Sequence, residues 1–539
     1  MGKILLAGEH GKRSRVMDAV GVVMNENVFD YLELAGDSGG AACLICDPHG
    51  ALTRRQFLEK VLAIGVWLYE TCGTGKMVGV FAEHTTDTLL WYLGALASGN
   101  CYVPLPPGMP QERFEKICAQ MNIQVVAGGV PLTAYTEGMD GSIRFVQTDI
   151  AANIRVSLEQ EQKLSACRRQ LSGDAPMYVI FTSGSTGEPK GIVKTHGALI
   201  SFLDSYIHEF GFRECDRLAS QTPFYFDASV KDIYLALKLK CQLHILDERL
   251  FVAPLRLAEY LKEQHISVIQ WVPSALCMLS RFRVFDQVSL PELKKVLFVG
   301  EVMPPGQLEI WMEALPDAEF VNLYGSSELA GICMSYRVRT LPEHTDCLPI
   351  GYPLPGCEVF LVSDGHLVKE PGALGEIYVR SDTIASGYWN DPVCSAQVFV
   401  KKPCEALPEA HYYKSGDLAK YDKQGALVFV SRDDYQIKHM GHRIELGEIE
   451  STLMKLPQIS GCCCLYEGQK IVLFYEGTSP RSDVSRYLKQ KLPSYMLPNK
   501  IIPVETLPRN ANGKADRTAL QNNLLRRRQA HGRTVGNTE

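Results

Sequence analysis

The feature that most constrains the fold is an alternation of apolar, strand-like runs with helical patterns across residues 52–400. A strand-like run at residues 78–82 precedes a helical pattern at residues 89–97, and a second run at residues 177–181 leads through a polar loop into another helical pattern. Further apolar runs begin at Val268 and Val296. This alternation predicts α/β layers with largely parallel strands.

The C-terminal part of the chain has a different pattern. Shorter strand-like runs prevail after residue 375, and a compact piece begins near Asp434. Within that piece we expect a helix at residues 446–456, a strand at residues 471–475 and a helix at residues 482–492. A chain of 539 residues is too long for one simple core, so about two to four domains are expected.

Composition excludes several classes of protein. Hydrophobic residues make up 46% and charged residues 22% of the chain, as in an ordinary globular enzyme, and the net charge of −6 offers no basic surface for nucleic acid. The apolar stretch at residues 4–7 is too short for a secretory signal, and Leu6 stands where a myristoylation signal needs Ser or Thr. No run is long enough to cross a bilayer. We therefore expect a cytoplasmic protein with no nucleic-acid and no membrane partner.

The 17 cysteines have no metal-binding pattern. Cys462, Cys463 and Cys464 are consecutive and cannot all face one ion from regular structure, and there is no pair of CxxC knuckles. We expect reduced thiols packed inside a cytosolic protein.

The strongest local signal is the run YVIFTSGSTGEPKGI at residues 178–192. An apolar strand leads directly into a turn of hydroxyl and glycine residues, which Lys190 follows. Glycines let backbone N–H groups face an anion, hydroxyls add donors, and a lysine adds a mobile positive charge. The run therefore predicts a loop that binds polyphosphate. Its turn consists of Thr182, Ser183, Gly184, Ser185, Thr186 and Gly187.

This loop is not a Walker A motif. Its lysine follows Glu188 and Pro189, whereas the Walker motif places Lys directly after Gly. A Gly-Thr-Gly-Lys run at residues 73–76 lacks the first glycine of the motif, and Met77 replaces its hydroxyl residue, so we expect a turn there. The structural alternative for the loop at residues 182–190 is a flexible surface hairpin.

The loop resembles the phosphate loop of the AMP-forming adenylate enzymes: acyl-CoA synthetases, luciferases and the adenylation domains of nonribosomal peptide synthetases. The resemblance covers residues 52–517, with the motifs in the order of that family. It implies a large N-terminal domain of layered α/β subdomains with a β-barrel-like part, residues 1–433, and a small mobile α+β domain, residues 434–539. The other motifs are LASGNCYVPLPP from Leu96, PFYFDASV from Pro223, NLYGSSE from Asn322, YKSGDLA from Tyr413, SRDDYQIKHMGHRIELGEIE from Ser431, LPSYMLP from Leu492 and NANGKADR from Asn510. The chain departs from the family pattern at Pro106, Ser326, Ser327, Ser431 and Met440.

The resemblance assigns nucleotide binding to several of these motifs. Tyr324 would stack on adenine, Glu328 would hold Mg²⁺, and Asp417 and Arg432 would bind the ribose of ATP. Taken singly, each has a plain alternative: Tyr324 as a core residue, Asp417 as a turn former, and Arg432 as a solvated partner of Asp433. The predicted nucleotide site comprises the turn at residues 182–187 together with Asn322, Tyr324, Gly325, Ser326, Asp417 and Arg432.

Lys514 is the predicted catalytic residue, together with Lys190 and Glu328. In the resembling family this lysine reaches from the small domain to the attacking carboxylate and the α-phosphate, where negative charge is redistributed as pyrophosphate leaves. A fixed cation there is worth a factor of about 10²–10³ in rate. We expect Lys514→Ala to abolish adenylate formation without unfolding the protein, with ATP–pyrophosphate exchange as the measurement.

The family uses its small domain a second time, to pass the acyl group to a thiol. By resemblance the domain would rotate about Asp434, and the segment around Gly441 would line the entry for a pantetheine thiol. Met440 lacks the usual positive charge beside this entry, which leaves the thiol partner open. No carrier or condensation signature is present, so we expect a stand-alone enzyme of nonribosomal peptide synthesis that loads a separate carrier protein bearing phosphopantetheine.

Asp227 bears on the substrate. In amino-acid-activating members this carboxylate pairs with the α-ammonium, because a buried carboxylate without a cation is costly; the alternative is that Asp227 caps the following helix. Lys231 favours an acidic or polar amino acid if it faces inward, but it could also point outward or pair with Asp232, and a small or cyclic amino acid stays open. The predicted pocket is lined by Asp227, Ala228, Lys231, Gln270, Leu297, Val299, Leu323, Gly331 and Ile332.

The predicted reaction is ATP- and Mg²⁺-dependent activation of an amino acid as aminoacyl-AMP, followed by transfer to a carrier thiol. One alternative keeps the fold: an acyl-CoA or aryl-CoA ligase, against which Asp227 argues. The other is an inactive nucleotide-binding scaffold, which would not need Lys190, Glu328, Asp417 and Lys514. ATP–pyrophosphate exchange across the amino acids and other carboxylic acids separates these hypotheses.

Overall fold

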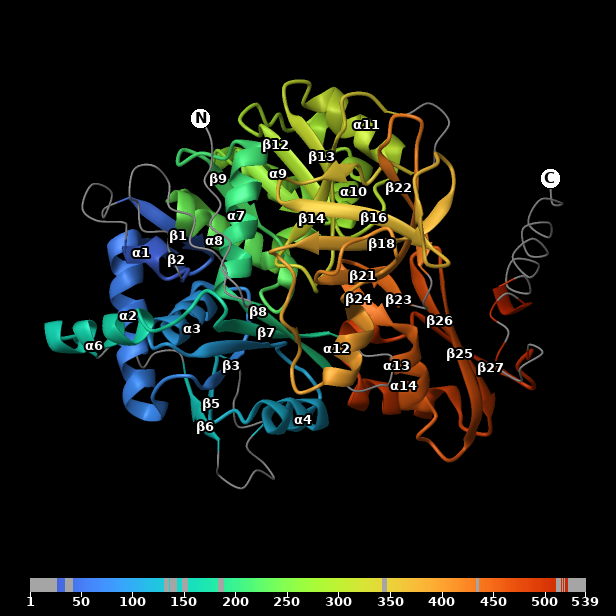
Figure 1. Cartoon of the computed structure of the whole chain (residues 1–539), viewed down its shortest axis with the longest axis horizontal. Coiled ribbons are helices and arrows are strands. Elements are labelled where there is room, and N and C mark those ends of the chain that lie inside the picture. Colours follow the sequence, from blue (N-terminus) through green and yellow to red (C-terminus); the bar gives the residue numbers. More distant parts are fainter. Residues whose placement is uncertain are drawn as a thin grey trace.

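The chain adopts a mixed α/β fold, as predicted. The computed structural model describes residues 27–33, 42–129, 135, 143–147, 154–182, 189–341, 347–432, 436–509, 515, 517 and 519–521. Within these ranges the strands form three large sheets, whose strands are interleaved along the chain, followed by a two-stranded hairpin and a three-stranded sheet (Figure 1). Across the same ranges, no helix is both long enough and apolar enough to cross a membrane.

The largest sheet has parallel strands at its centre, as the alternating pattern predicts. Its described strands run in the order β15-β14-β13-β12-β11-β9-β10-β1-β2, and neighbours from β13 to β1 are parallel. The bounds are β1 Cys43–Asp47, β2 Gly50–Thr53, β9 Arg217–Ser220, β10 Gln242–Ile245, β11 Val268–Trp271, β12 Lys295–Val299, β13 Glu319–Gly325, β14 Ile332–Arg337 and β15 Tyr352–Pro353.

The second sheet brackets the phosphate loop. Its described strands run in the order β19-β8-β7-β4-β3-β5-β6, and β7 pairs with β8 in antiparallel register up to the pair Thr182 and Lys190. Residues 183–188, the tip of that loop, lie outside the described residues. The bounds are β3 Met77–Phe81, β4 Cys101–Leu105, β5 Val125–Ala127, β6 Arg144–Val146, β7 Pro176–Thr182, β8 Lys190–Thr195 and β19 Gly387–Tyr388.

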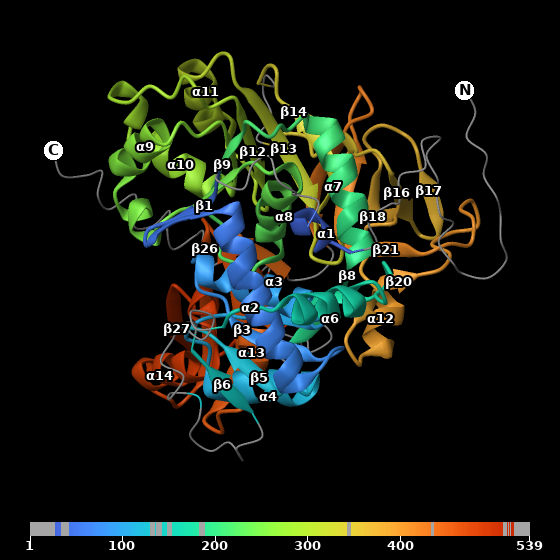
Figure 2. The same ribbon diagram turned by 90° about the vertical axis from the view of Figure 1, so that its left-hand side faces the viewer.

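Helices cover these two sheets. Figure 2 shows α2 and α6 beside one another on the outside of the second sheet. Helix α2 ends at Cys72, and Gly73 and Gly75 both have positive φ, which confirms a turn at residues 73–76. The helix bounds are α1 Asp30–Glu33, α2 Arg54–Cys72, α3 Thr86–Ala97, α4 Gln111–Met121, α6 Leu158–Arg168, α7 His196–Phe210, α8 Val230–Leu239, α9 Pro254–Glu263, α10 Pro273–Arg281, α11 Pro305–Ala314 and α12 Pro392–Val398.

The third sheet is antiparallel and supplies the barrel-like part of the fold. Its strands run in the order β17-β16-β18-β21-β20, and β22 pairs with β21. The β21–β22 register places Asp417 opposite Arg432. The bounds are β16 Cys357–Ser363, β17 His366–Val368, β18 Leu374–Ser381, β20 Phe399–Val400, β21 Tyr412–Tyr421 and β22 Leu427–Arg432.

The C-terminal unit has its own small core, formed by residues such as Ile449, Leu473 and Leu488. Helix α13, Leu446–Leu453, ends three residues before the predicted end, because the chain turns toward β25 at residues 454–458. The predicted strand and second helix are present as β26 and α14, each within two residues of its expected bounds. The remaining bounds are β23 Gln436–His439, β24 His442–Glu445, β25 Ile459–Glu467, β26 Lys470–Gly477, α14 Arg481–Lys491 and β27 Lys500–Val504.

Candidate active site

A cavity that opens to solvent, about 1270 Å³ when that open space is included, lies where the three large sheets meet the β23–β24 hairpin of the C-terminal unit. Thr182 at the end of β7 and Gly325 at the end of β13 form part of its wall. Asp227 comes from the turn before α8, Asp417 from β21, and Gly441 from the tip of the β23–β24 hairpin. The carboxyl ends of parallel strands commonly form ligand sites in α/β folds, and this cavity has that location.

One side of the cavity carries a carboxylate held by a guanidinium. Arg432 Nη1 lies 2.6 Å from Asp417 Oδ1, and Arg432 Nη2 donates to the Ser415 carbonyl at 3.2 Å. The Tyr324 hydroxyl donates to Asp417 Oδ2. Asp417 is 2% exposed and lies within a strand, so it is not a turn former, and Arg432 is not merely a solvated partner of Asp433. Burial raises the pKa of the Tyr324 phenol well above its usual value, and Asp417 raises it further, so the hydroxyl remains a donor.

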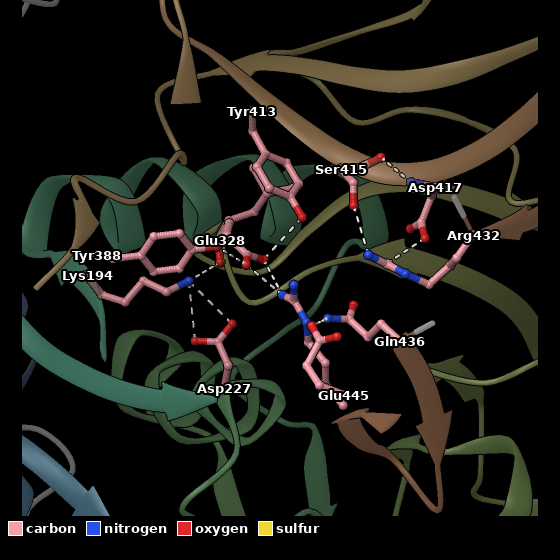
Figure 3. Close-up of polar contacts among 12 residues, drawn as sticks. Lys194, Asp227, Glu328, Tyr388, Tyr413, Ser415, Asp417, Arg432, Gln436 and Glu445 are labelled. Carbon is pink, nitrogen blue, oxygen red and sulfur yellow. Dashed lines mark hydrogen bonds and ion pairs between the residues drawn. The ribbon is translucent and has the colours of Figure 1, made fainter. Parts of the chain in front are cut away.

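Glu328 sits deeper, enclosed by donors from three elements (Figure 3). The Tyr388 hydroxyl donates to its Oε1 at 2.8 Å and the Tyr413 hydroxyl to its Oε2 at 3.1 Å. Arg443 Nη1, from the C-terminal hairpin, lies 2.6 and 2.5 Å from the two oxygens. Burial alone would raise the pKa of Glu328, but the guanidinium outweighs burial and lowers the pKa to about 2. Glu328 is therefore a carboxylate with its own cation.

This donor set does not fit Mg²⁺ in the arrangement described. Both oxygens of Glu328 accept hydrogen bonds from neutral or cationic donors, and the Arg443 charge would repel a dication. Among the described residues, no cluster of three His, Cys, Asp or Glu side chains could hold a metal ion. The assignment of Mg²⁺ to Glu328 thus stays a prediction that requires Arg443 to move.

Asp227, the residue expected to bind an amine, has partners inside the protein. The Tyr178 hydroxyl donates to its Oδ1 at 2.7 Å, and Lys194 Nζ lies 3.4 Å from each carboxylate oxygen. Asp227 begins the short 3₁₀ turn before α8, two residues ahead of the α8 N-cap Ser229, and its carboxylate accepts hydrogen bonds from Tyr178 and Lys194 rather than from helix N–H groups. The interpretation of Asp227 as a helix cap is therefore wrong.

Lys231 is also satisfied within the protein. Its Nζ donates to the carbonyl oxygens of Ala228 at 2.8 Å and of Gln270 at 3.2 Å, and it lies 3.8 Å from Asp232 Oδ1. The Gln270 amide in turn donates to Asp232 at 2.7 Å. These contacts give Lys231 a counter-ion without any substrate, which weakens the argument for an acidic side chain on the substrate.

The β23–β24 hairpin of the C-terminal unit closes the cavity. Its turn residues Met440 and Gly441 have φ of +51° and +80°, as a two-residue primed turn requires. The Gly441 N–H donates to Glu301 Oε1 at 2.9 Å. His442 stacks on Tyr495 and meets the edge of Phe226, with ring centroids 4.1 and 4.3 Å away. The hairpin thus packs both against Tyr495 of its own unit and against the turn that carries Asp227.

The structure gathers many of the predicted residues around this cavity. Its lining includes the predicted pocket residues Asp227, Ala228, Lys231, Val299, Gly331 and Ile332, and the predicted nucleotide residues Thr182, Gly325, Ser326, Asp417 and Arg432. Gln270, Leu297, Leu323, Asn322 and Tyr324 are buried behind this lining, with Asn322 donating to the Pro349 carbonyl at 2.8 Å. Lys190 Nζ lies 5.5 Å from the centre of the Tyr388 ring. Ser183, Gly184, Ser185, Thr186, Gly187, Asp434 and Lys514 lie outside the described residues.

Sequence reasoning missed several side chains at this site, among them Lys194, Arg443, Tyr388 and Lys438. Lys194 and Arg443 provide the cations for Asp227 and Glu328, and Lys438 Nζ lies 5.5 Å from the Tyr324 ring centre. A signal existed for Lys194, since a lysine interrupts an apolar strand run there. The sequence does not show which carboxylate each cation would meet.

The fold and site together define an adenylate-forming enzyme. Residues 33–389 match the AMP-binding enzyme family, and residues 448–514 match the AMP-binding enzyme C-terminal domain. The chain belongs to the AMP-binding enzyme family, whose members use ATP.

Several relatives are carrier-protein ligases. The chain is 30% identical to an L-proline–[L-prolyl-carrier protein] ligase of Pseudomonas fluorescens over 86% of this chain and 91% of that protein. It is 28% identical to a D-alanine–D-alanyl carrier protein ligase of Bacillus cytotoxicus over 87% of this chain and 94% of that protein. It is 29% identical to a plipastatin synthase protein of Bacillus subtilis over 92% of this chain, but spans only 19% of that protein's length.

A solved structure shows the same fold. The Vibrio cholerae adenylation domain AlmE, in complex with glycyl-adenosine-5′-phosphate, superposes with a TM-score of 0.79 at 20% identity and covers 94% of this chain and 99% of that chain. The predicted layered α/β fold with a barrel-like part and a small C-terminal sheet is thereby confirmed.

Proposed function

We propose that this enzyme activates an amino acid as aminoacyl-AMP and then transfers the aminoacyl group to the pantetheine thiol of a separate carrier protein. One observation carries the proposal: a single cavity is lined by the Asp417–Arg432 pair and by Asp227. The end of β7, the strand that leads into the phosphate loop, borders the same cavity. A ribose bound at Asp417 and an acid bound near Asp227 would therefore face each other across the space where a phosphate would lie. The named activities of the carrier-protein ligases support the same reaction.

The chemistry consists of two displacements. A carboxylate oxygen of the substrate attacks the α-phosphorus of ATP, the bond from that phosphorus to pyrophosphate breaks, and acyl-AMP forms. The thiol sulfur then attacks the acyl carbon, the bond from that carbon to the AMP oxygen breaks, and the thiol proton is released to solvent. In this chain Asp417 would orient the ribose, Arg432 would fix Asp417, and the Arg443–Glu328 pair would hold the hairpin in place.

The two steps require different surfaces of the C-terminal unit. We propose that residues 1–433 and 434–539 move as two units about Asp434, and that Lys514 and Lys190 serve the first step. In the arrangement described, the hairpin tip at Gly441 lines the cavity, which supports a role for this segment at the thiol entry in the second step.

A second candidate, an acyl-CoA ligase, is favoured by one observation: Asp227 already has a cation in Lys194, so a substrate ammonium is not required to neutralise it. The decisive experiment is ATP–pyrophosphate exchange with purified protein across the amino acids and a set of other carboxylic acids. It is followed by transfer of the activated acid to free coenzyme A and to phosphopantetheinylated carrier protein. Transfer to the carrier alone supports the proposal, transfer to coenzyme A alone supports the ligase, and no exchange with any acid overturns both.

A further inference from the structure

Lys194 is a buried cation that the reaction described above does not use. It lies near the end of β8, the strand that follows the phosphate loop, and it is 0% exposed. Its side chain is fully enclosed along its whole length, so the ammonium group does not reach solvent. Burying a lysine is costly unless it is paired. The structure therefore must supply a partner, and the identity of that partner bears on function.

The partners of Lys194 lie at the acid-binding end of the cavity (Figure 3). Its Nζ donates to the Leu329 carbonyl and lies 3.4 Å from each oxygen of Asp227. Asp227 keeps 10% of its side chain exposed and lines the cavity, whereas Lys194 stands behind it. Tyr178 completes the group with a hydroxyl that donates to Asp227 at 2.7 Å. The carboxylate that faces the substrate is therefore already bound to an ammonium group of the protein.

The other charges around the cavity are balanced in the same way. Lys231 pairs with Asp232 at 3.8 Å, and Glu328 pairs with Arg443. With the Lys194–Asp227 and Arg432–Asp417 pairs, four largely buried carboxylates in or behind the cavity wall each have an internal cation. A substrate ammonium beside Asp227 would add a positive charge within a few ångströms of Lys194, in a region that screens charges poorly. A hydroxyl in the same place would hydrogen-bond to Asp227 without this repulsion.

We propose that Lys194 is a specificity-determining residue: by neutralising Asp227 from inside the protein, it removes the preference for an α-ammonium. The enzyme would then adenylate a 2-hydroxy acid about as efficiently as the amino acid with the same side chain. This inference rests on the proposed adenylation and refines its substrate class. The group on carbon 2 takes no part in the covalent step, so the displacement at phosphorus is unchanged.

A purely structural role would give a different result. If Lys194 only tied β8 to the turn at Asp227, its loss would lower the activity toward all acids alike. If it sets specificity, its loss changes the ratio of kcat/KM for an amino acid to kcat/KM for the matching 2-hydroxy acid. That ratio cancels any general loss of folded or active enzyme.

The test measures this ratio by ATP–pyrophosphate exchange with three matched pairs: alanine and lactate, glutamate and 2-hydroxyglutarate, phenylalanine and 3-phenyllactate. We expect a ratio near one for wild-type protein, and a rise of about tenfold or more in Lys194→Met, because Asp227 then lacks a cation and an ammonium can replace it. If the Met variant does not fold, Lys194→Gln replaces it, because glutamine keeps a donor for the Leu329 carbonyl. We expect the same rise in that variant. Asp227→Asn is expected to lower the ratio, because Lys194 is then an unbalanced positive charge.

The matched control is Lys295→Met, since Lys295 also pairs with a carboxylate, Glu319 at 3.3 Å, but does not line the cavity. Its ratio should equal that of wild type. Folded Lys194 variants whose ratio stays within about twofold of wild type would overturn the inference, as would a wild-type enzyme that prefers amino acids by more than about tenfold. Absence of exchange with every acid would instead overturn the proposed function.

Discussion

Arg443, in the C-terminal hairpin, lies against both carboxylate oxygens of Glu328, a residue 115 positions earlier in the chain. Glu328 is 1% exposed, and the contact joins the C-terminal unit to a carboxylate buried behind the cavity lining. Breaking one member of a buried pair leaves an uncompensated charge, which costs about 3–5 kcal/mol. The pair therefore favours the arrangement in which the hairpin faces the cavity.

We predict that Arg443→Gln slows thiol transfer at least about tenfold, because the hairpin-facing arrangement loses one of its buried ionic contacts. Adenylate formation should change much less, since Glu328 is then released from Arg443 but keeps its two tyrosine donors. Single-turnover transfer and ATP–pyrophosphate exchange measure the two steps separately. Arg380→Gln, which breaks the exposed pair with Glu358, serves as the control and should alter neither step. Equal losses in both steps for Arg443→Gln would contradict the assignment.

The Arg443–Glu328 pair also predicts that the stability of the protein depends on pH. In the folded protein, against the opposing effect of burial, the Arg443 guanidinium lowers the pKa of Glu328 to about 2, from an ordinary glutamate value of 4.5. A lowered folded-state pKa adds stability that is fully present above pH 4.5 and is lost as the pH falls toward 2. We expect the difference in free energy of unfolding between wild type and Glu328→Gln to be constant from neutral pH to about 5, and to shrink by about 3 kcal/mol below that. Urea unfolding at a series of pH values tests this, and a difference that does not shrink in acid would be the contrary result.

Much of the fold could be predicted from the sequence because its signals are local. The apolar run of β7 leads directly into the hydroxyl–glycine turn. Thr182 and Lys190, which pair across the two strands, stand at the two ends of that turn. Asp417 and Arg432 could also be placed together, since both belong to motifs that flank one strand pair. The end of α13 was missed because the turn after Leu453 depends on how the helix packs against β25.

The ionic partners at the site could not be predicted, because each joins residues far apart in sequence. Lys194 and Asp227 are 33 positions apart, and Arg443 and Glu328 are 115 apart. The sequence predicts that Asp227 pairs with a substrate ammonium group, whereas in the structure Lys194 of strand β8 is its cation. Such pairs depend on how sheets are stacked, which periodicity and composition do not specify.

The hairpin tip gives a third prediction. Gly441 has φ +80°, and a Cβ added there would lie 2.9 Å from Val272 Cγ1. Gly425, in the turn between β21 and β22, has φ +82° with nothing within 4 Å of an added Cβ. Alanine at either position costs about 1 kcal/mol of backbone strain. Only Gly441→Ala also pushes the hairpin away from the cavity wall, so it alone should slow thiol transfer, by about tenfold. Matching transfer rates in the two variants would rule out a tight approach of this turn.

A fourth prediction concerns the contact between α4 and α13. Arg113 Nη1 lies 2.5 Å from Glu448 Oε1, with the side chains 9% and 1% exposed. Nearby, Lys491 lies 2.6 Å from Glu112, but these side chains are 37% and 48% exposed. The two ion pairs connect the same regions and differ mainly in burial, which makes them a matched comparison.

Arg113→Met leaves Glu448 buried without its cation, at a cost of about 3–5 kcal/mol, whereas Lys491→Met gives up a surface pair worth about 0–1 kcal/mol. We therefore expect Arg113→Met to depopulate the hairpin-facing arrangement and to slow thiol transfer at least about tenfold, with adenylate formation largely retained. Lys491→Met should leave both rates within about twofold of wild type. High salt should weaken the effect of Lys491→Met on thiol transfer but not the effect of Arg113→Met, because only the exposed Lys491–Glu112 pair is screened. If Lys491→Met slowed transfer as much as Arg113→Met, burial of the α4–α13 pair would not be what holds the C-terminal unit in this position.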